Sequence, residues 1–300
     1  MKNYILLLLL FGITFKSHAQ TSIFKNSDTL STKRVNIVTT AITANWIAQT
    51  SLASNVWYKN FDKSNFHLFD DSKEWLQMDK MGHFYSTNKL SKLYTDCYIW
   101  SGMPIKKSVI IGSLIGLGSE TTLEILDGFN TQWGFSLSDM AANTLGSITY
   151  ASQKLIWNEE RFLLKFSAHH TSYAALRPNV LGSTPLERML KDYNGQTYWV
   201  SFSPFAFSSN EKLPKWLCLS LGYSIDQKIN GLSNVYTDPI TSTTYNAKRE
   251  YLLSLDIDFS KLPIKKRWLK MVVSRFNYLK IPFPTLIFSN GQLIGKGIYF

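Results

Sequence analysis

The sequence predicts an α+β protein, in which an N-terminal bundle of four or five helices precedes a small C-terminal antiparallel β-sheet. Before residue 165 the chain contains long segments rich in small and apolar residues that are typical of helices. After about residue 195, apolar and polar residues alternate, as expected of strands with one apolar face. The length of 300 residues indicates one large domain or two smaller ones.

The N-terminus has the pattern of an export signal. Lys2 precedes an almost unbroken apolar run that ends at Phe15, and small residues stand before Gln20. The run is shorter than the roughly 20 residues that cross a bilayer, which favours a cleaved signal over an anchor. We therefore expect a signal peptide at residues 1–19 and a flexible lead at 20–34. The protein is therefore expected to be exported.

Charge narrows the expected partners. The chain has 32 basic and 21 acidic residues and a formal net charge of +11. Export argues against nucleic acid as a partner, whereas anionic lipid headgroups or another envelope component would suit a basic protein. A solvated positive loop is the favoured explanation of the charge. The densest basic stretch contains Lys261, Lys265, Lys266, Arg267 and Lys270.

The two cysteines, Cys97 and Cys218, stand in different contexts, one helical and one strand-like. Nothing in the sequence fixes the distance between them, so a disulfide stays open. We treat both as small buried apolar residues. The oligomeric state is likewise left open.

The helical region is expected at residues 35–165. The uncharged segment at 35–58 is expected to form a helix buried in protein, and a second helix is expected from Trp75 to Trp100. In the next helix, Gly112 and Gly116 would let a neighbouring helix approach closely. A further helix is expected at residues 136–157, with a serine as its N-cap.

Each of the last three helices carries a group of polar residues on one face. The stretch EWLQMDKMGHFYS, residues 74–86, places Asp79 and His83 four positions apart. Residues three, four or seven apart share a helix face. The same spacing joins Asp139 to Asn143, and it groups three acids of one helix, namely Glu120, Glu124 and Asp127.

The C-terminal half should supply the sheet. Residues 166–196 are expected to connect it to the helices, and residues 197–300 to form a β-rich region. Alternation is clear at residues 217–226 and 251–259 and weaker at 197–207. We count three strands and at most two more, and prolines interrupt the rest, whereas the smallest membrane barrels need about eight. A small sheet resting on the helices, or on a membrane, is the better prediction.

The motifs DKMGHF, EILDGF and SLSDMAANTLG, in this order, resemble the DUF2279 family of predicted periplasmic or outer-membrane-associated lipoproteins. The helices more distantly resemble VanZ-like membrane proteins. No Cys follows the apolar signal run, so the lipoprotein label is not expected to apply. The resemblance implies an exported protein of the periplasm or outer membrane of a Gram-negative envelope, and it carries no established activity. Its characteristic polar residues fall on Asp79, Lys80, His83, Glu124, Asp127, Asp139 and Asn143.

Two hypotheses explain these residues. In the first, Asp79, His83, Glu124, Asp127 and Asp139 converge to hold a divalent metal that activates water for hydrolysis. In the second they form a structural network, because buried charges must be paired. Asp79 would then pair with Lys80, His83 with Glu124, and Asn143 would bridge to a neighbouring helix.

No other catalytic motif is present. The chain lacks a Gly-x-Ser-x-Gly nucleophile turn and a phosphate-binding glycine loop. The sequence therefore favours a structural or binding role at the periplasmic face of the outer membrane and names no catalytic residue. The alternatives are a metal-dependent hydrolase acting on an envelope lipid or glycan and a polytopic VanZ-like membrane protein. The polytopic alternative is disfavoured by the polar residues within 35–58 and by an uninterrupted apolar run of only about a dozen residues.

Overall fold

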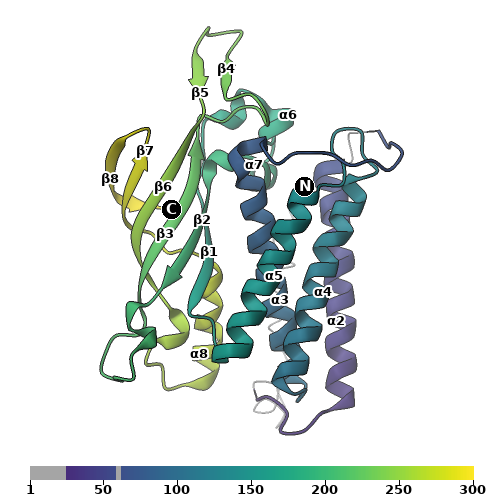
Figure 1. The fold of residues 1–300 in the computed structure, drawn as a ribbon, viewed down its shortest axis with the longest axis vertical. Helices are drawn as coiled ribbons and strands as arrows, with labels where there is room; N and C mark the ends of the chain where they lie inside the picture. Colours follow the sequence, from purple (N-terminus) through teal and green to yellow (C-terminus); the bar gives the residue numbers. More distant parts are fainter. Residues whose placement is uncertain (1–24, 59–61) are drawn as a thin grey trace.

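A computed structural model describes residues 25–58 and 62–300. It contains a layer of long helices beside an antiparallel sheet (Figure 1). The predicted α+β class, with the helices before the sheet, is confirmed. The expected signal peptide at residues 1–19 and the first part of the expected lead, residues 20–24, lie outside the described residues.

Four long helices form the helical layer. They are α2 (Thr32–Ala53), α3 (Met78–Trp100), α4 (Ile105–Asp127) and α5 (Leu137–Trp157). Ser31 and Ser136 cap α2 and α5 by accepting hydrogen bonds from backbone N–H groups of the first turns. The segment expected as a helix at 35–58 begins three residues earlier, at Thr32, and its last turn, Ser54–Tyr58, is a π-helix.

Glycines let α3 lie in direct contact with both α4 and α5. A Cβ atom at Gly112 would stand 2.4 Å from the backbone nitrogen of Thr95, and one at Gly146 would stand 2.3 Å from the carbonyl oxygen of Phe84. A Cβ at Gly116 would likewise meet Ser91. The close approach predicted for Gly112 and Gly116 is therefore confirmed, and it places the polar faces of three helices together.

The sheet is larger than the sequence indicated. Its order is β1-β2-β3-β6-β7-β8, with every neighbouring pair antiparallel. β1 was missed, because it lies at the predicted boundary between helices and connecting segment. The strands are β1 (Phe162–Ala168), β2 (Gln196–Phe202), β3 (Leu217–Asp226), β6 (Lys248–Ile257), β7 (Phe283–Ser289) and β8 (Gln292–Tyr299), and β4 (Val235–Thr237) and β5 (Thr244–Asn246) form a separate ribbon.

Short helices connect the strands. The chain between β1 and β2 contains η3 (Tyr173–Ala175), α6 (Pro178–Leu181), α7 (Pro185–Lys191) and η4 (Tyr193–Gly195). After β2, the weak strand signal at 197–207 ends in η5 (Pro204–Phe207), because Pro204 cannot donate to a strand ladder. η6 (Phe259–Lys261), α8 (Arg267–Ser274) and η7 (Arg275–Tyr278) lie between β6 and β7.

The two layers meet where α3 packs on the first strands of the sheet. The ring of Tyr85 contacts Phe166 on β1 and Tyr198 on β2, with centroids 6.0 and 5.8 Å away. Met78, at the start of α3, is fully buried beside Tyr198 and Ile225. This contact fixes the polar face of α3 relative to the segments that connect β1 to β2.

Two sequence-based expectations concern the cysteines and a membrane span. Both cysteines are free; Cys218 is buried and Cys97 is half-buried. Within the described ranges, α4 is the one helix long and apolar enough to cross a membrane, and 39% of its most apolar window is buried in the protein. α4 meets this test by its length and mean hydropathy, although its uninterrupted apolar run is only about a dozen residues long.

Candidate functional site

The site begins with a strained turn in front of α3. Trp75, Leu76 and Gln77 have φ angles of 48°, 51° and 67°, in the left-handed region that residues with side chains rarely adopt. Contacts from elsewhere in the chain hold this turn. The Trp75 N–H donates to Gly231 O at 2.8 Å, and Arg249 donates to the Gln77 side chain at 2.6 Å. Such strain often accompanies functional sites, and here it sets the direction in which α3 presents Asp79 and His83.

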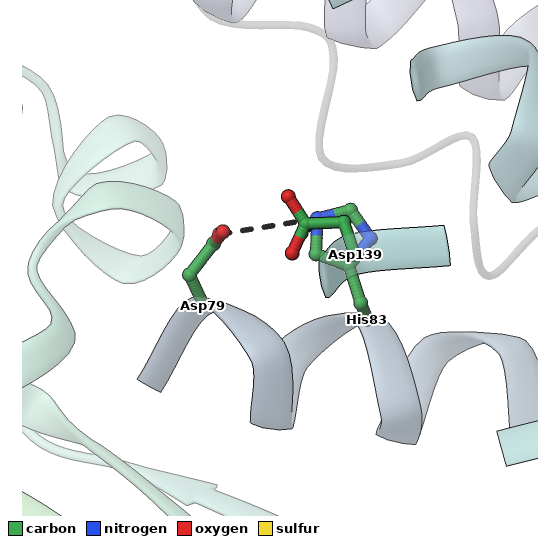
Figure 2. Close-up of side chains that lie close together, drawn as sticks. All are labelled: Asp79, His83 and Asp139. Carbon is green, nitrogen blue, oxygen red and sulfur yellow. Dashed lines mark ion pairs between the residues drawn. The ribbon is translucent and has the colours of Figure 1, made fainter. Parts of the chain in front are cut away.

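His83 is at the centre of the site. Its Nε2 atom lies 3.9 Å from Asp79 Oδ1 and 3.8 Å from Asp139 Oδ1. Figure 2 shows Asp79 and His83 on successive turns of α3, with Asp139 beside them. On the other side of the ring, Nδ1 lies 3.2 Å from Asn143 Oδ1 and 3.4 Å from Glu124 Oε1. The imidazole therefore joins three helices through both of its nitrogens.

Lys80 neutralises one side of the cluster. Its ammonium group lies 2.6 Å from Asp139 Oδ1, 2.7 Å from Asp71 Oδ2 and 3.0 Å from Asp79 Oδ2. Asp71 also accepts a hydrogen bond from Ser136, the N-cap of α5, at 2.6 Å. A single lysine thus links the loop before α3 to the first turn of α5.

The acids of α4 have different surroundings. Glu120 accepts a hydrogen bond from Gln49 at 2.8 Å and lies 4.0 Å from His83 Nδ1. Glu124 is only 1% exposed, and neither of its carboxylate oxygens has a hydrogen-bond partner among the described residues. Asp127 faces the Tyr58 hydroxyl and lines the same cavity. Glu124 is therefore a buried acid that points into the site without being satisfied there.

The density of acids changes the proton affinities. Burial alone would lower the pKa of His83, but the surrounding carboxylates, Asp79 foremost, outweigh it and raise the pKa to about 10. Burial raises the pKa of Glu124 to about 9, against the opposing effect of His83. Burial likewise raises the pKa values of Asp127 and Asp139 to about 7. The site therefore contains more carboxylates than its own cations can balance.

A cavity of about 730 Å³ opens beside this cluster. It is lined by Asp79, His83 and Asp139 and by the tryptophans Trp75 and Trp133. Arg177, from the segment that connects β1 to β2, lines it as well. The cavity therefore presents acidic groups, aromatic residues and a cation, which suits a ligand with more than one kind of group.

All seven residues singled out in the sequence lie in or beside this cluster. Asp79, Glu124, Asp139 and Asn143 surround His83, and Lys80 binds two of these acids. Of the five metal candidates, Asp79, His83 and Asp139 could hold an ion, because one potential ligand atom from each lies within 4.8 Å of the others. Glu124 lies on the other side of the His83 ring, beside Nδ1, and Asp127 lines the same cavity.

The pairings expected of a structural network are also present. Asp79 binds Lys80, His83 lies against Glu124, and Asn143 accepts a hydrogen bond from Thr87 on α3 at 2.7 Å. The network therefore accounts for part of the cluster. It leaves the Glu124 carboxylate without a hydrogen bond among the described residues.

Sequence reasoning missed three contributors. Tyr193 donates a hydrogen bond to Asp79 Oδ1 at 2.6 Å from the far side of the cavity. Asp71 comes from a loop, and Glu120 was placed on the acidic face of its helix without being assigned to the site. The helical spacing of Glu120 with Glu124 was a usable signal, whereas Asp71 and Tyr193 carry none that separates them from ordinary loop residues.

One family model matches part of the chain. Residues 67–153 match the model of a family described as "Predicted periplasmic lipoprotein (DUF2279)". The DUF2279 resemblance stated from the motifs is thereby confirmed for this part of the chain, which includes α3, α4, most of α5 and every residue of the predicted cluster. The match covers less than half of the chain and supports an exported, periplasmic protein.

The other comparisons add no relative. No curated protein and no solved structure matches the chain. The family model gives no support to the more distant VanZ-like resemblance. The function must therefore be argued from the site itself.

Proposed function

We propose that the protein is a binding protein of the cell envelope, at the periplasmic face of the outer membrane. Its cleft would hold a divalent cation on Asp79, His83 and Asp139. The observation that carries this proposal is the crowding of carboxylates around His83, with Glu124 buried and unsatisfied beside it. Crowded buried carboxylates disfavour one another's ionised form and so retain protons, and a cation in the cleft would relieve this crowding.

The donor set fits such an ion. Carboxylate oxygens with one imidazole nitrogen bind divalent cations of intermediate hardness, such as Mn²⁺ and Zn²⁺. Tyr193 and Asn143 would orient Asp79 and the His83 ring, in the manner of residues that position metal ligands. Lys80 already binds oxygens of Asp79 and Asp139, so a bound ion would share both acids with it.

Metal binding is testable with the purified mature protein. The metal content is measured as isolated, and Mn²⁺ and Zn²⁺ are then titrated calorimetrically into chelator-treated protein. We expect one ion per chain and at least a tenfold weaker affinity in Asp139→Asn, about 1.4 kcal/mol. Wild-type protein that binds neither ion, or an Asp139→Asn variant that binds as tightly as wild type, would refute the proposal.

Two further variants control for loss of structure. Asp96→Asn removes an acid from the same helix as His83 but at its other end, where Asp96 pairs with Lys92 and Arg275. Its metal affinity should equal that of wild type. Glu124→Gln leaves every contact of Lys80 in place and removes one negative charge beside His83, so weaker binding with an unchanged melting temperature would reflect the loss of that carboxylate.

A second candidate function is metal-dependent hydrolysis of an envelope lipid or glycan. The observation that favours it is the cavity of about 730 Å³ next to the proposed ion, which Arg177 also lines. A metal ion could then supply an activated water. Release of phosphate or acid from chromogenic phosphate and acyl esters, dependent on added metal and on His83, would support hydrolysis. Metal binding without any such turnover would favour the binding role.

A further inference from the structure

The sheet has an unusual distribution of polar and apolar residues. On β6, Ser254 and Asp256 are buried, whereas Tyr251, Leu253 and Leu255 are exposed. A sheet that packs only within a water-soluble protein buries its apolar residues and exposes its polar ones. In this part of the sheet the exposed face is apolar, whereas the buried face combines polar residues with a small apolar cluster of Trp199, Leu252 and Ile287.

The strand register gathers the exposed residues into one surface. Leu221 of β3 pairs with Leu253, and Leu253 pairs with Leu286 of β7. Directly paired residues in antiparallel strands lie on the same face. The resulting apolar sheet patch is 39 to 54% exposed at each side chain and consists of Leu221, Tyr251, Leu253, Leu255, Leu286 and Phe288.

The opposite face contains charges. Lys165 and Asp256 form an ion pair at 2.8 Å, and both side chains are fully buried. Ser201 donates a hydrogen bond to the same aspartate at 2.7 Å. Polar residues inside and apolar residues outside are typical of strands that face lipid.

The helical layer does not cover the patch. The helices meet the apolar face at β1 and β2, through Tyr85, Phe166 and Tyr198. In Figure 1, β6, β7 and β8 lie on the side of the sheet away from the helices. Large exposed apolar surfaces are uncommon on proteins surrounded by water alone and mark sites of interaction.

A basic helix lies at one end of the sheet. α8, at the lower end in Figure 1, exposes Trp268 and Val272, which are 52% and 48% exposed and lie on one helix face. Lys266, Arg267 and Lys270 are also exposed on or next to this short helix. Basic amphipathic helices with an exposed tryptophan bind the headgroup region of anionic membranes.

We infer that the apolar sheet patch contacts the acyl chains of a phospholipid leaflet, with α8 on its anionic headgroups. The attachment is peripheral, because the sheet has open edges whose backbone groups would lack partners inside the hydrocarbon layer. This inference rests on the proposed location in the envelope and is independent of the proposed cation site.

Vesicle flotation tests the inference. The full mature chain is mixed with vesicles of phosphatidylethanolamine and phosphatidylglycerol, and the floating fraction is measured. We expect the double variant Leu253→Ser, Leu286→Ser to lower vesicle affinity about tenfold or more, since two paired apolar side chains leave the lipid. Ile240→Ser is the matched control, because Ile240 is 90% exposed at the tip of the β4–β5 ribbon and outside the patch.

Four readouts decide the outcome. Wild-type affinity in the double variant, with a circular dichroism spectrum unchanged, would overturn the inference. So would a wild-type dimer in lipid-free buffer that the double variant abolishes, since the patch would then join two copies of the chain. Vesicles of phosphatidylcholine alone should bind more weakly, which reports on the basic helix. The double variant should bind Mn²⁺ as wild type does, so failure of the lipid inference is distinguishable from failure of the proposed cation site.

Discussion

His83 Nδ1 lies 3.4 Å from Glu124 Oε1, and this contact joins the polar face of α3 to that of α4. Glu124 is almost completely buried and has no hydrogen-bond partner among the described residues, and His83 lies within ion-pair distance of it. The pair is therefore sensitive to protons and to any cation that enters the cleft. The first prediction below follows from this sensitivity.

Without a bound cation, stability should fall as the pH rises from about 5 to about 9. The pKa of Glu124 is raised from 4.5 to about 9, so the folded protein holds a proton that the unfolded chain releases in this range. A group with a raised pKa stabilises the fold below its unfolded pKa, and this contribution is lost as the pH rises through the folded value. The raised pKa of His83, about 10, acts in the same direction at the alkaline end.

Thermal melting in the presence of a chelator, at several pH values, measures this trend. Glu124→Gln should flatten it, because glutamine does not titrate, whereas Glu211→Gln on an exposed loop should leave the slope unchanged. A melting temperature that rises steadily between pH 5 and 9 in wild-type protein would contradict the prediction. Saturating Mn²⁺ should reverse part of the slope, because a cation favours the ionised carboxylates.

Substitution of Gly146 by alanine should destabilise the protein by about 1–3 kcal/mol, the usual range for overpacking. Its Cβ would stand 2.3 Å from the carbonyl oxygen of Phe84, so α3 and α5 would have to move apart. Urea denaturation measures the loss. Gly297→Ala is the control, because a Cβ there meets nothing within 4 Å, and a similar loss in both variants would remove the helix contact as the explanation.

Replacement of Lys165 by methionine should destabilise the protein by about 3–5 kcal/mol, because Asp256 would remain buried as an uncompensated charge. Lys248→Met breaks a partly exposed pair with Asp226 and should cost no more than about 1 kcal/mol. Equilibrium denaturation of both variants gives the comparison. Equal losses would mean that the buried pair contributes nothing beyond an ordinary surface ion pair.

Which residues belong to the cluster could be predicted, because its members occur in pairs that are close together in the sequence. Asp79 with His83, and Asp139 with Asn143, lie four residues apart, and helical periodicity alone places each pair on one face. The motif order then linked the three helices to one family. By contrast, the contacts of Tyr193 and Asp71 depend on loops whose paths no periodic pattern describes.

The strands were predictable in a different way. Alternation at 217–226 matches β3 in both bounds, and alternation at 251–259 gave a strand whose bounds lie within three residues of those of β6. β1 was missed and the sheet was expected to be smaller, because its short strand follows α5 closely and lies where a connecting segment was expected. Alternation also cannot say which face is buried, since either face of a strand can turn toward the rest of the chain.

By itself, the sequence determined the order of helices and strands, the export pattern, and the polar residues that each helix presents on one face. These properties depend on neighbours within a few positions along the chain. Only the tertiary structure decided that His83 meets acids from three helices, that Glu124 has no hydrogen bond among the described residues, and that the apolar residues of β3, β6 and β7 face outward. The physical reason is that these features depend on how distant segments pack, which glycine contacts and strand register set across the whole chain.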